Sequence, residues 1–116
     1  MSERGAPEPI SRPLYYVLVG QTPVPEPNIE RWALAFEQCD RIVAQAEVGS
    51  SMISTVFLGI DHSFIDDGPP ILFETMTFSD SESADCERCS TWLEAEAQHA
   101  RIVAQVRSKF KRTPRA

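Results

Sequence analysis

A short polar segment between two apolar runs holds the residues best suited to chemistry. Asp61 and His62 end the first run, and Asp66 and Asp67 follow them. An Asp-His pair with other carboxylates nearby can act as a general base or supply half of a metal site. Neighbouring residues on a strand point to opposite faces, however, so the pair cannot easily act on one atom. We therefore favour a second interpretation, in which these side chains cap strand ends and accept hydrogen bonds from loop amides.

Glu74 is an acid within the apolar-rich second run. Strand alternation places it on the same face as Met76 and Phe78, so a covered face would bury its carboxylate. A buried carboxylate needs an arginine, a lysine or several hydrogen-bond donors, which predicts a structural ion pair more readily than catalysis. The internal cations available for such a pair are Arg31, Arg41, Arg88 and Arg101.

Cys86 and Cys89 form a C-x-x-C motif in an acidic stretch. A zinc site would require two further ligands, and only His62 and His99 could supply histidine. A redox motif is disfavoured because the neighbouring acids would raise the pKa of the thiols. We assign no metal ligand and no cofactor, and we expect His99 to be a packed core residue.

A β-hairpin with a long loop is predicted over residues 53–78, around this polar segment. Both runs are rich in β-branched and aromatic residues, and the loop carries the glycine and prolines that favour turns. Upstream, residues 14–19 (LYYVLV) predict an interior strand, and the proline-rich residues 20–27 predict an extended link. Apolar residues then recur at steps of three and four, which predicts a first helix over 28–49 with Asn28 as its N-cap.

A second helix is predicted to begin at Ser90 or Thr91, because Thr91 and Glu94 have the spacing of a capping box. The acidic stretch before it, 79–90, predicts a connection without regular structure. The element order is therefore β-α-β-β-α. We predict an α+β fold with a small, mainly antiparallel three-stranded sheet that carries both helices on one face.

The two predicted helices share sequence. A shift of 60 residues aligns 32–45 with 92–105 at several positions, including the whole run Arg-Ile-Val-Ala-Gln. Duplication of a strand-plus-helix unit would explain the match, as would shared packing requirements combined with chance.

Length and charge limit the classes of function. The 116 residues suit one domain, predicted over 14–110 between a flexible segment (1–13) and a basic tail (111–116). Residues 1–106 hold six basic side chains against all 17 acidic ones, a balance near −11, which makes general nucleic-acid binding unfavourable. No apolar run approaches the roughly 20 residues that would span a membrane, so we expect a soluble protein without membrane partners.

Both faces of the predicted sheet would be apolar. One face would display Val56 and Leu58 from the first run, with Leu72, Met76 and Phe78 from the second. Two helices on one face leave the other bare, and soluble monomers seldom expose so large an apolar patch. We therefore predict that these five residues form an interface in a homo-oligomer, a dimer or larger, or with another partner.

Three segments resemble a protein family. They are STVFLGIDHSF (54–64), GPPILFETMTF (68–78) and ERCSTWLEAEAQH (87–99). Together they are similar to a family of small uncharacterised proteins of tailed phages and prophages, with the patterns STxFLGxDHxF, GPPxLFETMxF and ERxSTWxEA. The resemblance implies a phage accessory protein in the cytoplasm of an infected bacterium, with no activity to carry over.

Our first hypothesis is a non-catalytic, self-associating binder that interferes with a bacterial host process, such as antiviral defence. It would block a CRISPR or other defence protein, or sequester a small signalling nucleotide. The alternatives are a metal-assisted hydrolase built on the Asp61/His62 loop and a minor structural protein of the virion. The candidate partner- or ligand-binding residues are Asp61, His62, Phe64, Asp66, Asp67 and Glu74.

Overall fold

The computed structural model describes residues 12–63, 68–79 and 85–112. Predictions for the N-terminal segment up to residue 11, for Phe64, Asp66 and Asp67, and for the last four residues lie outside this part. The elements in chain order are β1 (Tyr16–Val19), β2 (Thr22–Pro25), α1 (Ile29–Gln38), β3 (Ile42–Val48), β4 (Ser51–Phe57), β5 (Phe73–Phe78), β6 (Asp85–Cys89) and α2 (Trp92–Arg112).

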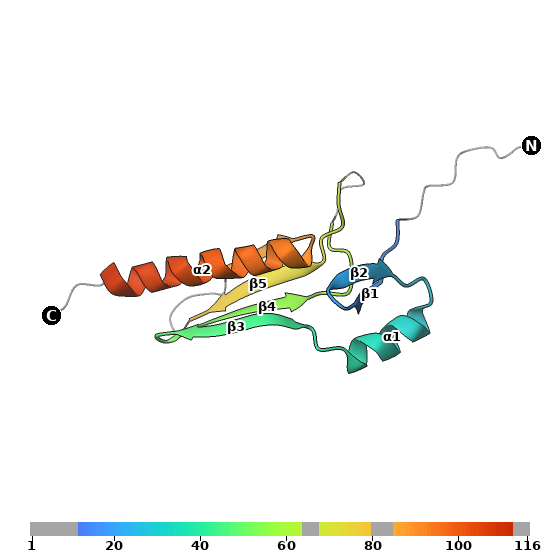
Figure 1. The fold of residues 1–116 in the computed structure, drawn as a ribbon, viewed down its shortest axis with the longest axis horizontal. Helices are drawn as coiled ribbons and strands as arrows, with labels where there is room; N and C mark the ends of the chain where they lie inside the picture. Colours follow the sequence, from blue (N-terminus) through green and yellow to red (C-terminus); the bar gives the residue numbers. More distant parts are fainter. Residues whose placement is uncertain (1–11, 64–67, 80–84, 113–116) are drawn as a thin grey trace, which may run out of the picture.

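The fold is α+β, but the predicted three-stranded sheet is wrong. The described strands form a two-stranded sheet, β1-β2, and a four-stranded sheet in the order β3-β4-β5-β6. Neighbouring strands pair antiparallel throughout, so the larger sheet is a meander (Figure 1). Two of its strands come from segments predicted otherwise: β3 from the end of the first predicted helix, and β6 from the acidic connection.

The predicted hairpin forms the centre of this larger sheet. β4 and β5 pair from Met52 opposite Phe78 to Phe57 opposite Phe73, with the long loop between them. Two further backbone bonds extend the pairing into the loop: the Leu58 N–H donates to the Leu72 carbonyl, and the His62 N–H donates to the Ile71 carbonyl. The loop therefore leaves the sheet through a narrow, hydrogen-bonded neck.

Helix α1 is shorter than predicted. Its N-cap is correct, since the Asn28 side chain accepts hydrogen bonds from the N–H groups of Glu30 and Arg31, both at 3.0 Å. The helix ends at Gln38, and the carboxylate of Asp40 then accepts the Ile42 N–H at 3.1 Å. From Ile42 onward the backbone pairs with β4, so sheet hydrogen bonds replace the helix predicted to continue to residue 49.

Gly49, the last residue of that predicted helix, instead lies in a hairpin turn. Val48 pairs with Ser51, so Gly49 and Ser50 are the two residues that join β3 to β4. Gly49 has a φ of 59°, a left-handed conformation that two-residue hairpin turns require and that glycine adopts at little cost.

The repeated pentapeptide has two different structures. In residues 41–45 the run Arg-Ile-Val-Ala-Gln enters and forms strand β3, whereas in residues 101–105 the same run lies within helix α2. The match between the two halves therefore does not reflect a duplicated structural unit. Pairing with β4 determines the conformation in the first case, and packing on the sheet determines it in the second.

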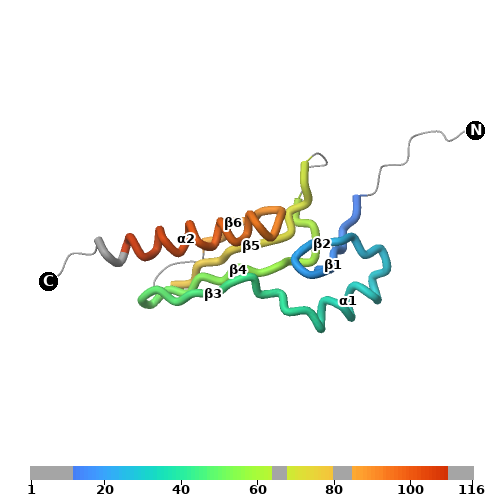
Figure 2. Tube along the Cα trace, in the orientation of Figure 1, coloured from blue at the N-terminus to red at the C-terminus, as the bar shows by residue number. Residues whose placement is uncertain are grey.

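Helix α2 covers one face of the four-stranded sheet (Figure 2). Its start is as predicted: the Glu94 N–H donates to the Thr91 hydroxyl at 3.0 Å, and the Glu94 carboxylate accepts the Thr91 N–H at 3.2 Å. Apolar residues from α2 and the sheet form the core, which includes Ile53, Phe57 and Phe73 at 0–1% exposure. None of the described helices is long and apolar enough to cross a membrane.

Helix α1 does not share that face with α2. It packs against β1 at one end of the molecule, so the prediction of two helices on one face is wrong (Figure 1). The Trp32 indole N–H donates to the carbonyls of Tyr16 and Gly59, each at 3.0 Å, and ties α1 to the chain after β4. A β-bridge between Tyr15 and Ile60 joins the small sheet at the same point. The β1 segment, predicted as an interior strand, thus lies outside the main sheet.

Candidate functional site

Asp61 is an organising residue at the neck of the loop. Its carboxylate accepts hydrogen bonds from the N–H groups of Ser63 at 2.8 Å and Ile71 at 2.9 Å, one on each side of the loop. The second carboxylate oxygen forms an ion pair with Arg12 at 3.2 Å, and only 6% of the side chain is exposed. The geometry agrees with the capping interpretation, and it leaves this carboxylate little capacity to act on a substrate.

The remaining loop candidates do not join Asp61 in a cluster. His62 donates its backbone N–H to the Ile71 carbonyl, and its imidazole lies close enough to Glu74 to favour the ionised carboxylate. Phe64, Asp66 and Asp67 lie outside the described residues. Within the described ranges, no group of three or more His, Cys, Asp or Glu residues could hold a metal ion.

Glu74 forms the structural pair that its position suggested. It lies opposite Arg88 in the β5-β6 register, and its carboxylate accepts the Arg88 Nε–H at 2.9 Å and the Cys86 thiol at 2.9 Å. Burial opposes ionisation of Glu74, but the hydrogen bonds from Cys86 and Arg88 outweigh it and lower its pKa. The carboxylate is thus ionised at neutral pH, and both donors bind its Oε2 atom.

The C-x-x-C motif cannot work as a unit. Cys86 lies opposite Met76 and Cys89 lies opposite Phe73, so the two thiols point to opposite faces of β6. Burial and the Glu74 carboxylate raise the pKa of Cys86, and burial with Glu94 and Glu87 raises that of Cys89 to about 11. Both thiols are therefore protonated at neutral pH, which disfavours nucleophilic and redox chemistry.

His99 is a buried core residue, as expected. Its Nδ1 lies 2.8 Å from the Thr55 hydroxyl, which in turn lies 2.6 Å from the Thr75 hydroxyl, between α2 and the sheet. Burial lowers the pKa of His99, so the ring is neutral in the folded protein at neutral pH. All three residues are at most 9% exposed, which leaves no path for a substrate.

The face of the larger sheet opposite α2 has no helix on it among the described elements. We call it the open face. The register puts Ile42 beside Val56, Met52 beside Phe78, and Met76 beside Ser54 on this face. Ile42 is 46% exposed and Phe78 is 47% exposed, and the other three apolar side chains are half-buried. The apolar side chains of the open face are Ile42, Met52, Val56, Met76 and Phe78.

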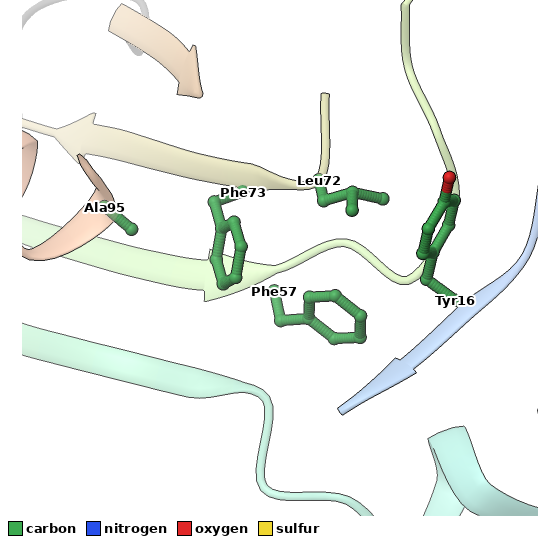
Figure 3. Close-up of a cluster of buried hydrophobic side chains, with 5 residues drawn as sticks. All are labelled: Tyr16, Phe57, Leu72, Phe73 and Ala95. Carbon is green, nitrogen blue, oxygen red and sulfur yellow. The ribbon is translucent and has the colours of Figure 1, made fainter. Parts of the chain in front are cut away.

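Two of the five predicted interface residues lie elsewhere. Leu72 precedes the start of β5 and is 1% exposed in the core, beside Tyr16 and Phe57 (Figure 3). Alternation placed it on the face of Met76, but the ladder begins only at Phe73, so alternation does not extend to it. Leu58 follows the end of β4 and is half-buried at the loop neck.

Sequence reasoning missed several structural partners. Arg12 was assigned to a flexible segment, yet it pairs with Asp61 across 49 positions of sequence. Thr55 and Thr75 carried a usable signal, because each shares an inward face with a buried phenylalanine of its own strand, Phe57 or Phe73, and so required a buried partner.

Comparison with known proteins gives no relative: no family model, no curated protein and no solved structure matches this chain.

Proposed function

We propose that the protein is a non-catalytic binding protein that acts through contact with other protein surfaces. The observation that carries this proposal is the open face, a sheet surface with five apolar side chains and no covering helix among the described elements. Soluble proteins seldom leave such a surface uncovered unless it binds something. The open face is therefore the candidate site of action.

The state of the polar residues supports binding over catalysis. The carboxylates of Asp61 and Glu74 each accept at least two hydrogen bonds, and the His99 ring is buried between α2 and the sheet. A metal-assisted hydrolase would require carboxylate or imidazole groups with free coordination positions, converging on one point. Asp61 and Glu74 are instead held by their own structural partners.

The shape of the surface favours a protein over a nucleotide as the bound molecule. Small ligands bind in concave pockets that enclose most of their surface, whereas protein interfaces are broad and flat. A sheet face belongs to the second kind. Sequestration of a signalling nucleotide would require a different part of the molecule.

We further propose that the biological role is interference with a bacterial host process, with antiviral defence as the candidate target. The support is the resemblance of the hairpin and the start of α2 to small phage proteins, together with the acidic body of the chain. An acidic surface steers a protein toward basic partners, such as nucleic-acid-binding effectors.

Plating assays test this role. The protein is expressed in bacteria that each carry one defence system, CRISPR systems included, and a phage restricted by that system is plated. We expect plating to rise at least about tenfold for one system, and affinity capture from those cells to recover a component of it. No increase across the panel, with a thermal shift on adding a cyclic dinucleotide, would replace protein blocking by nucleotide capture.

A further inference from the structure

Most polar side chains of the open face pair with one another, and Glu47, opposite Met52 on this face, is exposed to solvent. Glu74 accepts bonds from Arg88 and Cys86, and the Gln45 amide donates to the Ser54 hydroxyl at 3.3 Å. Burial of this face would therefore leave few groups without partners, provided that the covering surface is itself apolar and makes no demand for charge. The open face of a second copy is such a surface, because its apolar side chains surround polar groups that are already paired.

The charge on this face points the same way. Residues 1–106 have a balance near −11, yet on the open face the Glu74–Arg88 pair is neutral as a unit, and Glu47, at the edge of the face near the β3-β4 turn, adds a single negative charge. A basic protein would gain little attraction from this face, so attraction to basic partners would come from the acidic surface elsewhere on the body. Two copies of the face would meet with little repulsion.

The dimensions also suit self-association. Four strands spaced by about 4.8 Å, with about six residues each at about 3.3 Å, give a plan area of roughly 400 Å² per subunit. The accessible area exceeds the plan area because side chains project from it. Stable interfaces bury about 600–1,000 Å² per partner, so a plan area below that range predicts a weak dimer that dissociates on dilution.

We infer that the open face binds the open face of a second copy of this chain, which names the partner at the site on which the proposed function rests. The two sheets pack about 10 Å apart with their strands within roughly 30° of alignment, as sheets in sandwiches do. The two α2 helices then lie on the outside. Met76, opposite Ser54 in the middle of the face, lies near the two-fold axis.

Light scattering on the purified chain tests the inference across the micromolar range. We expect the mass to rise from 13.0 kDa toward twice that value, with a dissociation constant of about 1–100 µM. Met76→Glu places a charge at the centre of the face and should weaken the dimer at least tenfold. Leu93→Glu is the matched control, because Leu93 is 75% exposed on α2, away from the open face, and its replacement should leave the dimer unchanged.

Alkylation of the natural cysteines gives a second readout that needs no variant. Cys86 lies on the open face, while Cys39 lies at the end of α1, outside the sheet. Dimerisation should slow the modification of Cys86 as the protein concentration rises and leave that of Cys39 constant. Circular dichroism of Met76→Glu verifies that the variant is folded.

A chain that stays monomeric at every concentration, with constant Cys86 reactivity, would overturn the inference. So would a dimer that Met76→Glu leaves intact while the variant remains folded. These outcomes are independent of the plating assay. A monomer that raises plating would leave the proposed function standing, with a host protein as the partner of the open face. A dimer that has no effect on plating would leave the inferred interface standing and remove the proposed role in the host.

Discussion

Replacement of Asp61 by alanine is the sharpest test of how the loop is held. The change removes the acceptor for two backbone N–H groups, at 2.8 and 2.9 Å, and the partner of Arg12. A hydrogen bond to a charged group contributes about 1.5–3 kcal/mol, and a partly exposed ion pair adds about 0–1 kcal/mol. Water can reach the half-buried Ser63 N–H in the variant, so we expect a net loss of about 3 kcal/mol from the free energy of unfolding.

Urea unfolding followed by far-ultraviolet circular dichroism measures this loss. For a domain of this size, it corresponds to a fall in Tm of about 10–15 °C. Asp61→Asn keeps an oxygen for the two N–H groups, but both bonds become neutral ones and the ion pair is lost, so it should cost about 2 kcal/mol, less than Asp61→Ala. Asp40→Ala is the matched control elsewhere, since it removes a single exposed bond to the Ile42 N–H and should cost at most about 1 kcal/mol. Equal stabilities of Asp61→Ala and Asp61→Asn would refute the reasoning.

Two further substitutions test the packing of α1 and the buried histidine. Gly59→Ala would drive a Cβ into the Phe36 ring at a φ of 76°, so we expect α1 to be displaced and tryptophan fluorescence to change. Gly20→Ala, at a φ of 64° with open space around it, should cost only about 1–2 kcal/mol. An unchanged emission spectrum in Gly59→Ala would contradict this contact. Because burial lowers the pKa of His99, the unfolded chain takes up its proton first, and stability conferred by the neutral ring is lost as pH falls below about 6.5. His99→Asn should therefore give a shallower decline in stability between about pH 7 and pH 5 than the wild type, and identical slopes would exclude His99 as the source.

The central hairpin and the start of α2 could be predicted from the sequence because their signals are local. The hairpin has dense β-branched and aromatic runs with turn residues between them, and Thr91 and Glu94 cap the helix through their own side chains. The end of α1 could not be predicted from spacing alone. Steps of three and four continued past Gln38, although Ala44, Ala46 and Val48 also alternate with polar residues, as a strand requires.

The same contrast between local signals and distant partners explains which parts of the candidate site could be predicted. The partner of Glu74 was among the four arginines considered, and register selects Arg88 because it lies directly opposite on β6. That strand was missed because its sequence, DCERC, is short and acidic and has no alternation. Leu72 was misplaced because it precedes Phe73, where the ladder begins, and the start of a ladder depends on the partner strands, which a single segment does not reveal.

The identical run at 41–45 and 101–105 limits how the chain can be cut or transplanted. Residues 42–48 take their conformation from β4, which follows them in the sequence. A fragment that stops before Ser51 would lack β4, the strand with which β3 pairs. Without that pairing, residues 42–48 could adopt the helix that their apolar spacing favours. Strand β3 and helix α2 therefore fold as one cooperative unit with the β4-β5 hairpin, and neither can serve as an independent module.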